Sequence, residues 1–342
     1  MKRVLVTGGC GFIGSNFVRL LLAEEPRAEI VNLDALTYAG NPRNLEDLAA
    51  GPRYRFVRGD IRDPDTVEPL VAEADWLVNF AAETHVDRST KEPGDFIQTN
   101  VFGTFVLLDA LRRAGRRARF LQIGTDEVYG DVPHGFPDEE AQLHPSSPYS
   151  AAKAGGDLQA LAFHRTFELD VIVSRCTNNY GPYQYPEKLV PLFATNALDD
   201  QPLPLYDGGT QIRDWLWVDD HCRALLLLLR EGRAGEIYNV GANQTPEVNN
   251  GELTRMILSA SDKPATLIDP VVGLRPGHDQ RYAVSTAKLR ALGWRPTLSL
   301  EEGIARTVAW YRARRDWWEP IKSGAFREFY TSHYQQVDRA SS

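Results

Sequence analysis

The sequence predicts an α/β fold in which a mostly parallel sheet carries helices on both faces. Short aliphatic runs with the length of buried strands alternate with segments whose apolar residues recur at helical spacing, and residues 4–6 and 12–22 are the first such pair. Between them, Gly8 to Gly14 form a glycine-rich turn from strand to helix. Alternating strands and helices build a parallel sheet, because each crossover needs a helix to return the chain. We therefore expect a doubly wound sheet of the Rossmann type, accompanied by a smaller mixed α/β lobe.

The strand and helix signals continue in order along the chain. From Gly181 to Gly209 the chain is rich in Pro, Gly and Tyr, and this change of composition marks the start of the smaller lobe. We expect a sheet domain formed by residues 1–180 with about 213–245, and a lobe formed by about 181–212 with 246–330. Further strands are expected over 29–33, 54–57, 76–80, 120–123, 171–174 and 237–240, and helices over 96–113, 149–167, 253–260 and 300–314. A strand end followed by a long helix is expected over 214–229.

The composition is that of an ordinary globular protein. The 342 residues are 43% hydrophobic and 25% charged, and the net charge is −8. An acidic chain gains nothing from the counterion release that drives nucleic-acid binding, so nucleic acid and anionic membranes are not expected as partners. The longest aliphatic run, 225–229, is far shorter than a membrane span. Cys10, Cys176 and Cys222 form no metal-binding pattern. Because glycines interrupt any signal-peptide core, we expect a cytoplasmic protein with reduced thiols and no metal.

The turn after the first strand has the form of a dinucleotide-binding fingerprint. Gly8 permits the tight turn, Gly11 lets the backbone approach a pyrophosphate, and Gly14 lets the helix pack closely on the strand. Asp34 ends the second strand about 20 residues further on, as the fingerprint requires. A carboxylate there accepts hydrogen bonds from ribose hydroxyls and repels a 2′-phosphate, which favours NAD over NADP. The alternative is a glycine-rich turn without a ligand, and the complete strand, turn and helix argue against it.

Asp60 and Ile61 follow the third strand, where a doubly wound sheet would place them beside the adenine of a dinucleotide. An aspartate in such a place can also simply cap its loop. Both interpretations, contact with the adenine and loop capping, stay open.

Tyr149 and Lys153 lie four residues apart on an expected helix, so they share one helix face. A lysine ammonium beside a phenol favours the phenolate and lowers the pKa of the tyrosine. The pair would make Tyr149 a base toward a substrate hydroxyl. Taken alone, the same spacing also occurs among ordinary surface residues.

Thr125, Asp126 and Glu127 follow the fifth strand, at the edge where ligands sit in doubly wound sheets. A hydroxyl and two adjacent carboxylates there are poor choices for stability, but they suit a reaction that needs an acid and a base. A charged loop is the alternative. In combination with the glycine turn and the Tyr149–Lys153 pair, the triplet indicates an enzyme.

Several longer motifs resemble those of the dTDP-glucose 4,6-dehydratase family, which belongs to the extended short-chain dehydrogenases/reductases. The resemblance extends from Val4 to about Tyr311. Thr-Asp-Glu separates this family from related sugar-nucleotide epimerases and decarboxylases. The motifs are residues 8–14, Ala81-Ala82-Glu83-Thr84-His85-Val86-Asp87-Arg88-Ser89, 125–130, 149–153, 178–183, 186–189, Arg213-Asp214-Trp215 and 275–279.

The resemblance implies NAD-dependent dehydration of a nucleoside diphosphate glucose, most simply dTDP-glucose, to the 4-keto-6-deoxy sugar. Tyr149, helped by Lys153 and Thr125, takes the proton of the 4-hydroxyl while the cofactor receives a hydride from C4. Glu127 then removes the C5 proton, Asp126 protonates the departing 6-hydroxyl, and the hydride returns to C6. Asp126 must start protonated and Glu127 ionised. Repulsion between neighbouring carboxyls pushes one pKa upward, although the pair titrates as a unit.

Further contacts carry over by position in the motifs, with NAD in the sheet domain and the sugar nucleotide in the smaller lobe. The guanidinium forks of Arg213 and Arg275 match diphosphate oxygens, and surface ion pairs are the alternative for both. The implied NAD contacts are Gly8, Gly11, Phe12, Ile13, Gly14, Asp34, Asp60, Ile61, Ala81, Ala82, Thr99, Tyr149, Lys153 and Asn179. The implied sugar-nucleotide contacts are Thr84, Thr125, Asn178, Lys188, Leu189, Pro204, Tyr206, Arg213, Asn250, Arg275 and His278.

Three places depart from the family pattern. Gly124 stands where the family has Ser, Leu274 stands where it has Asp, and residues 244–251 differ from the usual segment. The base of the nucleotide and the pathway that uses the product therefore stay open. Two other functions stand as alternatives: an epimerase or decarboxylase of the same fold, and a non-catalytic NAD-sensing protein. The resemblance also implies a homodimer, formed through the helices at 96–113 and 149–167.

Overall fold

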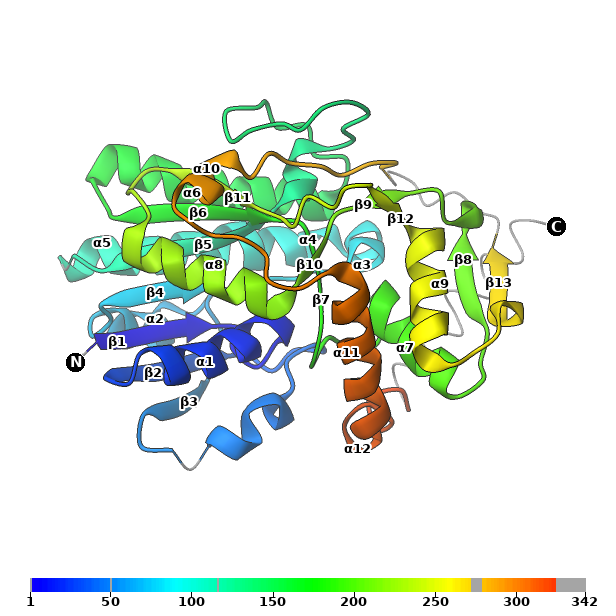
Figure 1. Ribbon diagram of the computed structural model, residues 1–342. Coiled ribbons are helices and arrows are strands. Elements are labelled where there is room, and N and C mark those ends of the chain that lie inside the picture. Colours follow the sequence, from blue (N-terminus) through cyan, green and yellow to red (C-terminus); the bar gives the residue numbers. More distant parts are fainter. Residues whose placement is uncertain (1, 50, 116, 272–278, 324–342) are drawn as a thin grey trace.

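The computed structural model describes residues 2–49, 51–115, 117–271 and 279–323, and its centre is a seven-stranded parallel sheet (Figure 1). The strand order is β11-β6-β5-β4-β1-β2-β3. Strand β1 lies between β2 and β4, so the winding direction reverses there, which opens a crevice at the carboxyl ends. The predicted doubly wound fold is confirmed. The strands are β1 (Lys2–Thr7), β2 (Ala28–Asp34), β3 (Tyr54–Arg58), β4 (Trp76–Asn79), β5 (Arg119–Thr125), β6 (Val171–Cys176) and β11 (Ile237–Val240).

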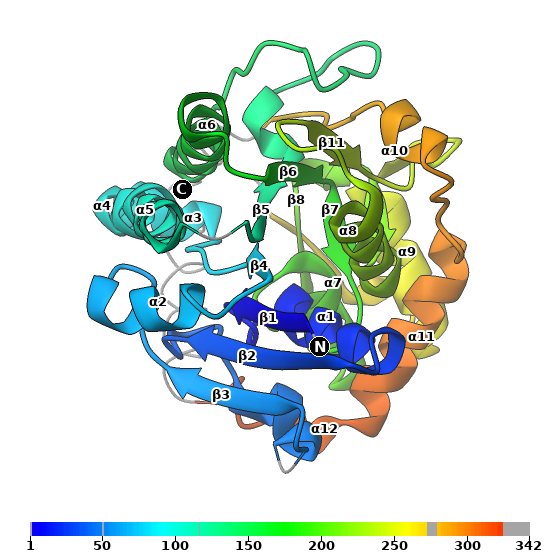
Figure 2. The ribbon, with the colours of Figure 1, turned by 90° about the vertical axis from the view of Figure 1, so that its left-hand side faces the viewer.

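Helices cover both faces of the sheet, and Figure 2 shows the sheet between the two layers. One layer buries the apolar sides of α1 (Phe12–Glu24), α8 (Val218–Glu231) and α10 (Ala287–Ala291) against the sheet. The other layer consists of α2 (Pro64–Val71), α5 (Thr104–Ala114) and α6 (Pro148–Phe167). None of the described helices is both long and apolar enough to cross a membrane.

The helix expected over 96–113 is divided in the structure. It consists of α4 (Pro93–Phe96), a π-helical stretch (Ile97–Gly103) and α5, with α3 (Val86–Lys91) just before it. Inside the π-helical stretch, Asn100 accepts a hydrogen bond from the N–H of Glu83 at 2.9 Å and donates one to its carbonyl at 3.1 Å. Widened turns of this kind often mark functional sites. Here the widened turn places the side-chain amide of Asn100 against the loop that follows β4.

A row of polar side chains crosses the middle of the sheet. Thr7, Asn79 and Gln122 are register partners on β1, β4 and β5, and all three are buried. The Thr7 hydroxyl donates to Asn79 Oδ1 at 2.6 Å, and Asn79 Nδ2 donates to Gln122 Oε1 at 2.9 Å. A slip of one residue would turn these groups to the opposite face and leave them without partners. The polar row therefore fixes the register of the central strands.

The smaller lobe has its own apolar core, formed by α7, α9, α11 and α12 with short strands around them. Helix α9 begins three residues earlier than predicted, because Asn249 and Glu252 form a reciprocal capping box at its start. The predicted end of the lobe near 330 lies outside the described residues. The elements are β7 (Asn178–Tyr180), α7 (Leu189–Leu198), β8 (Leu203–Tyr206), β9 (Ile212–Arg213), β10 (Trp215–Trp217), β12 (Val248–Asn249), α9 (Asn250–Ser261), β13 (Ile268–Val271), α11 (Leu300–Ala313) and α12 (Arg315–Trp318).

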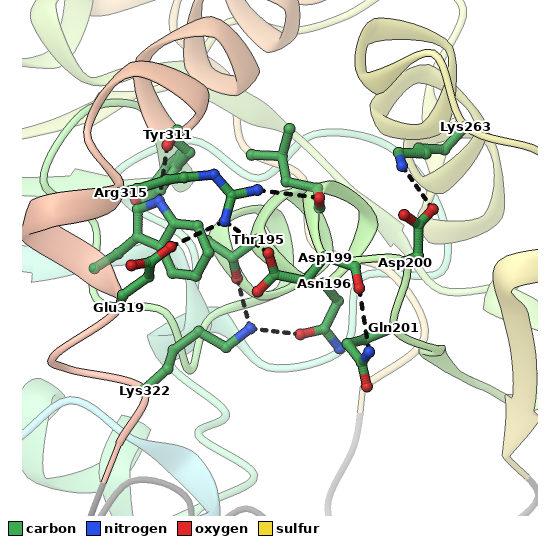
Figure 3. Close-up of polar contacts among 12 residues, drawn as sticks. Thr195, Asn196, Asp199, Asp200, Gln201, Lys263, Tyr311, Arg315, Glu319 and Lys322 are labelled. Atoms are coloured by element: carbon green, nitrogen blue, oxygen red, sulfur yellow. Dashed lines mark hydrogen bonds and ion pairs between the residues drawn. The ribbon is translucent and has the colours of Figure 1, made fainter.

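Polar contacts attach the last described segment to helix α7 of the same lobe (Figure 3). Arg315 donates to Asp199 Oδ1 at 2.8 Å, at the end of α7. Lys322 Nζ donates to Thr195 Oγ1 at 3.1 Å and to Asn196 Oδ1 at 2.7 Å, and burial lowers the pKa of its ammonium to about 8. These bonds hold the end of the described chain against α7.

The same segment also reaches the sheet domain. The indole N–H of Trp317 donates to Asn44 Oδ1 at 2.8 Å, and Asn44 Nδ2 donates to the carbonyl of Cys10 at 2.9 Å. Cys10 lies in the glycine-rich turn. Trp317 therefore connects the C-terminal part of the lobe to that turn through one intermediate side chain.

This connection predicts a graded loss of stability. Trp317 is 1% exposed, so Trp317→Ala should lower the free energy of unfolding by about 3–5 kcal/mol through lost burial and the cavity left behind. Trp317→Phe should lower it by about 1–3 kcal/mol, because Asn44 Oδ1 loses its donor. Urea denaturation measures both values, with Phe56→Ala (39% exposed) as the control. An alanine variant within 1 kcal/mol of wild type would contradict the bracing role of Trp317.

Candidate active site

A cavity of about 530 Å³ lies at the carboxyl ends of the sheet strands, within the size range of small-molecule sites. Its walls come from the turns after β1 to β5, from α6 and from the segment 176–188. All of the predicted cofactor and catalytic residues lie on this one cavity. The predicted residues that line it are Gly8, Gly11, Phe12, Ile13, Gly14, Asp34, Asp60, Ile61, Ala81, Ala82, Thr84, Thr99, Thr125, Asp126, Glu127, Tyr149, Lys153, Asn178, Asn179 and Lys188.

In the glycine turn, the backbone passes close to neighbouring backbone segments, and side chains at the glycine positions would collide with them. Gly8 has φ +68°, and a Cβ there would lie 2.7 Å from the N atom of Ala81. A Cβ on Gly14 would lie 2.9 Å from Gly9 Cα. Helix α1 starts after Gly11 without a side-chain cap, so its first N–H groups face the cavity wall as free donors. The turn can therefore hold a pyrophosphate against the start of the helix.

Asp34 is held by two backbone donors at the end of β2. Its Oδ2 accepts from the N–H of Cys10 and its Oδ1 accepts from the N–H of Leu36, both at 2.8 Å. Burial raises the pKa of this carboxyl, and the two backbone bonds oppose that rise. Each oxygen keeps a further lone pair toward the cavity, so the carboxylate is oriented to accept ribose hydroxyls.

Asp60 caps its own loop. It accepts from the N–H of Arg62 at 2.8 Å and from the guanidinium of the same residue, with Nη2 to Oδ2 at 2.6 Å. The capping interpretation therefore describes the observed bonds. Because Asp60 and Ile61 also line the cavity, contact with an adenine stays a prediction.

The acid pair sits at the end of β5 in a one-turn 3-10 helix, η3 (Asp126–Tyr129). Thr125 caps this turn, because its hydroxyl accepts from the N–H of Glu127 at 3.3 Å and also lies 3.3 Å from Asp126 Oδ1. Asp126 is 3% exposed and its Oδ2 has no partner among the described residues. The turn thus presents a buried hydroxyl and a buried carboxyl side by side.

The two carboxyls have different surroundings. Burial raises the pKa of Asp126 well above its ordinary value, and the charge of Glu127 adds to the rise. Burial also raises the pKa of Glu127, but the positive charges of Lys188 and Arg213 oppose it. Asp126 is therefore the member that keeps a proton, and Glu127 is the member that faces cations.

Tyr149 and Lys153 lie one turn apart at the start of α6, and both are buried. The expected lowering of the Tyr149 pKa by Lys153 is wrong for this arrangement. Burial, followed by the charge of Glu127, raises the pKa of Tyr149 well above its ordinary value, while a hydrogen bond with Thr125 opposes the rise. Lys153 donates instead to the carbonyl of Ile123 at 2.5 Å, and burial lowers the pKa of its ammonium. The phenol consequently keeps its proton until further positive charge enters the cavity.

Several predicted sugar-nucleotide residues do not line this cavity. Arg213 donates to the carbonyl of Asp279 at 2.8 Å and lies 4.1 Å from the ring centroid of Tyr282, so its guanidinium holds the start of the segment at 279. Arg275 and His278, with Leu274, lie outside the described residues. Leu189, Pro204, Tyr206 and Asn250 belong to the smaller lobe, at α7, β8 and α9.

Part of the cavity wall was not predicted from the sequence. An edge-on pair of rings, Tyr38 and Tyr185, lies with centroids 5.7 Å apart, and Arg88 stacks over Tyr38 at 4.0 Å. Glu187 is buried beside these groups, 3.7 Å from Arg88 Nη2. The position of Glu187 inside the motif 186–189 was the available signal. Among the additional lining residues are Thr37, Tyr38, Glu83, Asp95, Cys176, Thr177, Gln184, Tyr185 and Glu187.

Two departures from the family pattern have structural explanations. A Cβ on Gly124 would lie 2.8 Å from the carbonyl of Ser174 and 2.9 Å from both carboxylate oxygens of Asp157, so the glycine leaves room for that carboxylate. Gln244 pairs with the backbone of Trp215 and accepts its N–H at 2.9 Å, so it supports β10. Among the described residues, no group of His, Cys, Asp and Glu side chains could hold a metal ion.

Comparisons with known proteins agree with this geometry. A sequence model of the GDP-mannose 4,6 dehydratase family matches residues 5–307. A dTDP-glucose 4,6-dehydratase of Streptomyces niveus is 52% identical over 326 residues, which covers 94% of this chain and 96% of the relative.

Solved structures give the same result. A dTDP-glucose 4,6-dehydratase from Streptomyces venezuelae, with NAD bound, is 51% identical with a TM-score of 0.90, and the match covers 94% of this chain and 100% of that one. A UDP-glucose 4-epimerase from Thermus thermophilus, also with NAD, is 33% identical with a TM-score of 0.83, over 91% of this chain and 99% of that one. The chain therefore belongs to the dTDP-glucose 4,6-dehydratase family.

Proposed function

We propose that the protein dehydrates dTDP-glucose to the 4-keto-6-deoxy sugar with bound NAD, using Thr125, Asp126, Glu127, Tyr149 and Lys153. The observation that carries the proposal is the acid pair: two adjacent carboxyls, one with its pKa raised well above the ordinary value and the other with its rise opposed by Lys188 and Arg213, share one cavity with a buried phenol. Such separation of two neighbouring carboxyls is how a site assigns an acid and a base. The dTDP-glucose 4,6-dehydratases found by comparison support the substrate.

The residues around the glycine turn fit NAD. The free N–H groups at the start of α1 suit the pyrophosphate, and the Asp34 carboxylate suits the ribose hydroxyls while it repels a 2′-phosphate. When bound, NAD supplies a positively charged hydride acceptor that takes a hydride from C4 and later returns it to C6. The contacts that we assign to it are those predicted from the sequence, all of which line the cavity.

Tyr149 begins the reaction as the base toward the sugar 4-hydroxyl. Its phenol is crowded by carboxylates that oppose ionisation, and the hydrogen bond with Thr125 is the contact that favours the phenolate. Thr125 lies between the phenol and Asp126. It can therefore orient the oxygen that loses the proton.

Asp126 and Glu127 carry out the loss of water. Asp126 holds a proton and has a free Oδ2, so it can donate to the departing 6-hydroxyl. Glu127 is faced by Lys188 and Arg213, which favour its ionised form, so it can take the C5 proton once a 4-keto group has acidified it. Because the carboxyls are adjacent, both can reach neighbouring carbons of one sugar.

We assign NAD to the sheet domain (1–180 with about 213–245) and the sugar nucleotide to the lobe (about 181–212 with 246–330). Thr84, Asn178 and Lys188 would contact the sugar, since they line the cavity. Lys188 donates to the carbonyl of Thr84 at 3.0 Å. This bond joins the loop after β4 to the segment before α7 in the cavity wall. We assign Leu189, Pro204, Tyr206, Arg213, Asn250, Arg275 and His278 to the nucleotide end.

An epimerase is the second candidate, because a UDP-glucose 4-epimerase shares the fold at 33% identity. Product analysis separates the two functions. Purified protein is incubated with dTDP-, UDP- and CDP-glucose in parallel, and we expect a 4-keto-6-deoxy sugar, formed fastest from dTDP-glucose. A C4 epimer as the product would refute dehydration. NAD binding without turnover of any of the three would leave a sensing protein.

We further propose that the protein is a cytoplasmic homodimer. Cys10, Cys176 and Cys222 are buried free thiols, as is usual in a reducing compartment. Figure 2 places α5 and α6 side by side at the surface, and large apolar side chains are exposed on these helices and on the π-helical stretch. Exposed apolar side chains on neighbouring helices are typical of an interface between subunits. The exposed residues are Ile97, Phe102, Phe105, Leu158 and Phe167.

The dimer predicts the effect of a charge on this surface. Leu158 is 55% exposed on α6, so Leu158→Glu should leave the fold intact and place two carboxylates at the symmetric contact. Size-exclusion chromatography with light scattering should show a monomer. Phe136→Glu is the matched control, because Phe136 is 53% exposed on a loop. The assignment fails if wild type is monomeric or if Leu158→Glu still dimerises.

Asp126→Asn tests the acid role. The amide cannot donate a proton to the leaving hydroxyl, so product formation should fall by about 100-fold or more. C4 oxidation should change by only a few fold, so the absorbance of reduced nicotinamide should rise and persist. Stopped-flow absorbance measures both phases, with Asp131→Asn, an exposed acid nearby, as the control. Equal loss of oxidation and elimination would contradict the assignment.

Tyr149→Phe tests the base. Without the phenolic oxygen the 4-hydroxyl keeps its proton, so oxidation at C4 should fall by about 100-fold or more and no reduced nicotinamide should appear. Cofactor affinity, measured by fluorescence quenching, should stay within a few fold. Normal formation of reduced nicotinamide in this variant would remove Tyr149 from the mechanism.

A further inference from the structure

One buried guanidinium contacts both of the elements that carry the proposed catalytic side chains. Arg175 lies near the end of β6 and is 2% exposed. Its Nε donates to Asp157 Oδ2 at 3.0 Å, and its Nη1 donates to the hydroxyl of Tyr129 at 2.9 Å. Asp157 stands on α6, one turn beyond Lys153, while Tyr129 ends the turn η3 that begins at Asp126. The two arms of one side chain therefore connect the helix of the phenol to the turn of the acid pair.

The connection continues across the sheet. Gly124 and Asn239 are the register neighbours of Arg175 on β5 and β11. The hydroxyl of Tyr129 donates to Asn239 Oδ1 at 2.9 Å. The carboxylate of Asp157 occupies the space that a side chain at Gly124 would need. Three adjacent strands thus support one polar cluster beneath the acid pair.

The chemistry of this cluster indicates that it positions neighbouring elements and does not only stabilise the fold. A buried ion pair is often no more stabilising than apolar side chains of the same volume, so stability alone does not explain its presence. A guanidinium fixes the direction of two bonds at once, whereas a lysine ammonium of equal charge does not have this planar fork. Catalytic groups must be held within roughly 0.5 Å of their working positions. The fork supplies such a constraint between α6 and η3.

We propose that Arg175 is a positioning residue that, through Asp157 and Tyr129, holds the acid-pair turn in a fixed place relative to helix α6. The inference rests on the proposed function, because its consequence is that Asp126 and Glu127 reach the same sugar as Tyr149. Arg175 itself does not line the cavity. Loosening the fork should therefore slow the elimination step while substrate binding and C4 oxidation continue.

Tyr129→Phe is the first test, since it removes a single hydroxyl from the cluster and leaves the Arg175–Asp157 pair intact. We expect single-turnover elimination to slow by about 10-fold or more, oxidation at C4 and KM to stay within about 3-fold, and reduced nicotinamide to accumulate. Tyr238→Phe is the matched control, because Tyr238 is a buried tyrosine on β11 whose hydroxyl accepts a hydrogen bond from the N–H of Arg233 at 3.1 Å. The control should retain wild-type rates in both steps.

Arg175→Lys is the second test, because it keeps the positive charge beside Asp157 and removes the fork. We expect a kcat at least 10-fold lower with KM within about 3-fold, and faster amide hydrogen exchange in peptides that cover 125–130. Arg119→Lys is its control: Arg119 donates to Asp170 Oδ2 at 3.0 Å at the opposite end of β5. Hydrogen exchange reports on the turn independently of catalysis.

The outcomes separate this inference from the proposed function. If wild type forms no 4-keto-6-deoxy sugar, the proposed function fails, and hydrogen exchange alone decides whether Arg175 holds the turn. If wild type is active and Tyr129→Phe eliminates water at the wild-type rate with unchanged exchange, the positioning role is wrong. A loss of oxidation and elimination in equal measure also overturns it, because that result indicates a general structural defect. Should Arg175→Lys fail to fold, Tyr129→Phe still decides the question.

Discussion

The register of the three central strands is the constraint on which the rest of the molecule depends. Thr7, Asn79 and Gln122 form a hydrogen-bonded row across β1, β4 and β5 in a buried layer of the sheet. Leaving an amide unpaired in this layer would cost about 1–3 kcal/mol, so the row selects one alignment of strands whose other buried residues are mostly apolar. That alignment brings the ends of β1, β4 and β5 to one edge. The glycine turn, the Glu83 loop and the acid pair consequently face the same cavity.

Several carboxyl groups of the site are buried away from water. Asp126 and Asp214 each have a buried oxygen without a partner among the described residues, and each has its pKa raised by burial. Such groups lower stability, and Asp126 lines the cavity while the charge of Asp214 adds to the rise of its pKa. Perturbed acids beside a cavity are typical of a site that uses them for chemistry. Arg213 opposes the rise of both pKa values, whereas Lys188 opposes only that of Glu127. The asymmetry that the reaction needs therefore arises from the surroundings of the two carboxyls.

The two regions of the chain are joined at points far apart in sequence. Trp317 reaches the glycine turn through Asn44, and inside the predicted lobe the hydroxyl of Tyr311 donates to the carbonyl of Gln184, a residue that lines the cavity, at 2.5 Å. The C-terminal helices thus contact both the cofactor side and the substrate side of the cavity.

Most of the architecture and the chemical inventory of the site followed from the sequence. Periodicity predicted the strands and most of the helices, and local spacing predicted the glycine turn, Asp34, the Thr125–Glu127 triplet and the Tyr149–Lys153 pair, because these patterns depend on neighbouring residues. The tertiary structure decided the rest. It reversed the expected pKa shift of Tyr149, engaged Arg213 with backbone carbonyls, divided the helix at 96–113, and placed Asp157 over Gly124. Those outcomes depend on burial and on contacts between distant segments, which local spacing does not encode.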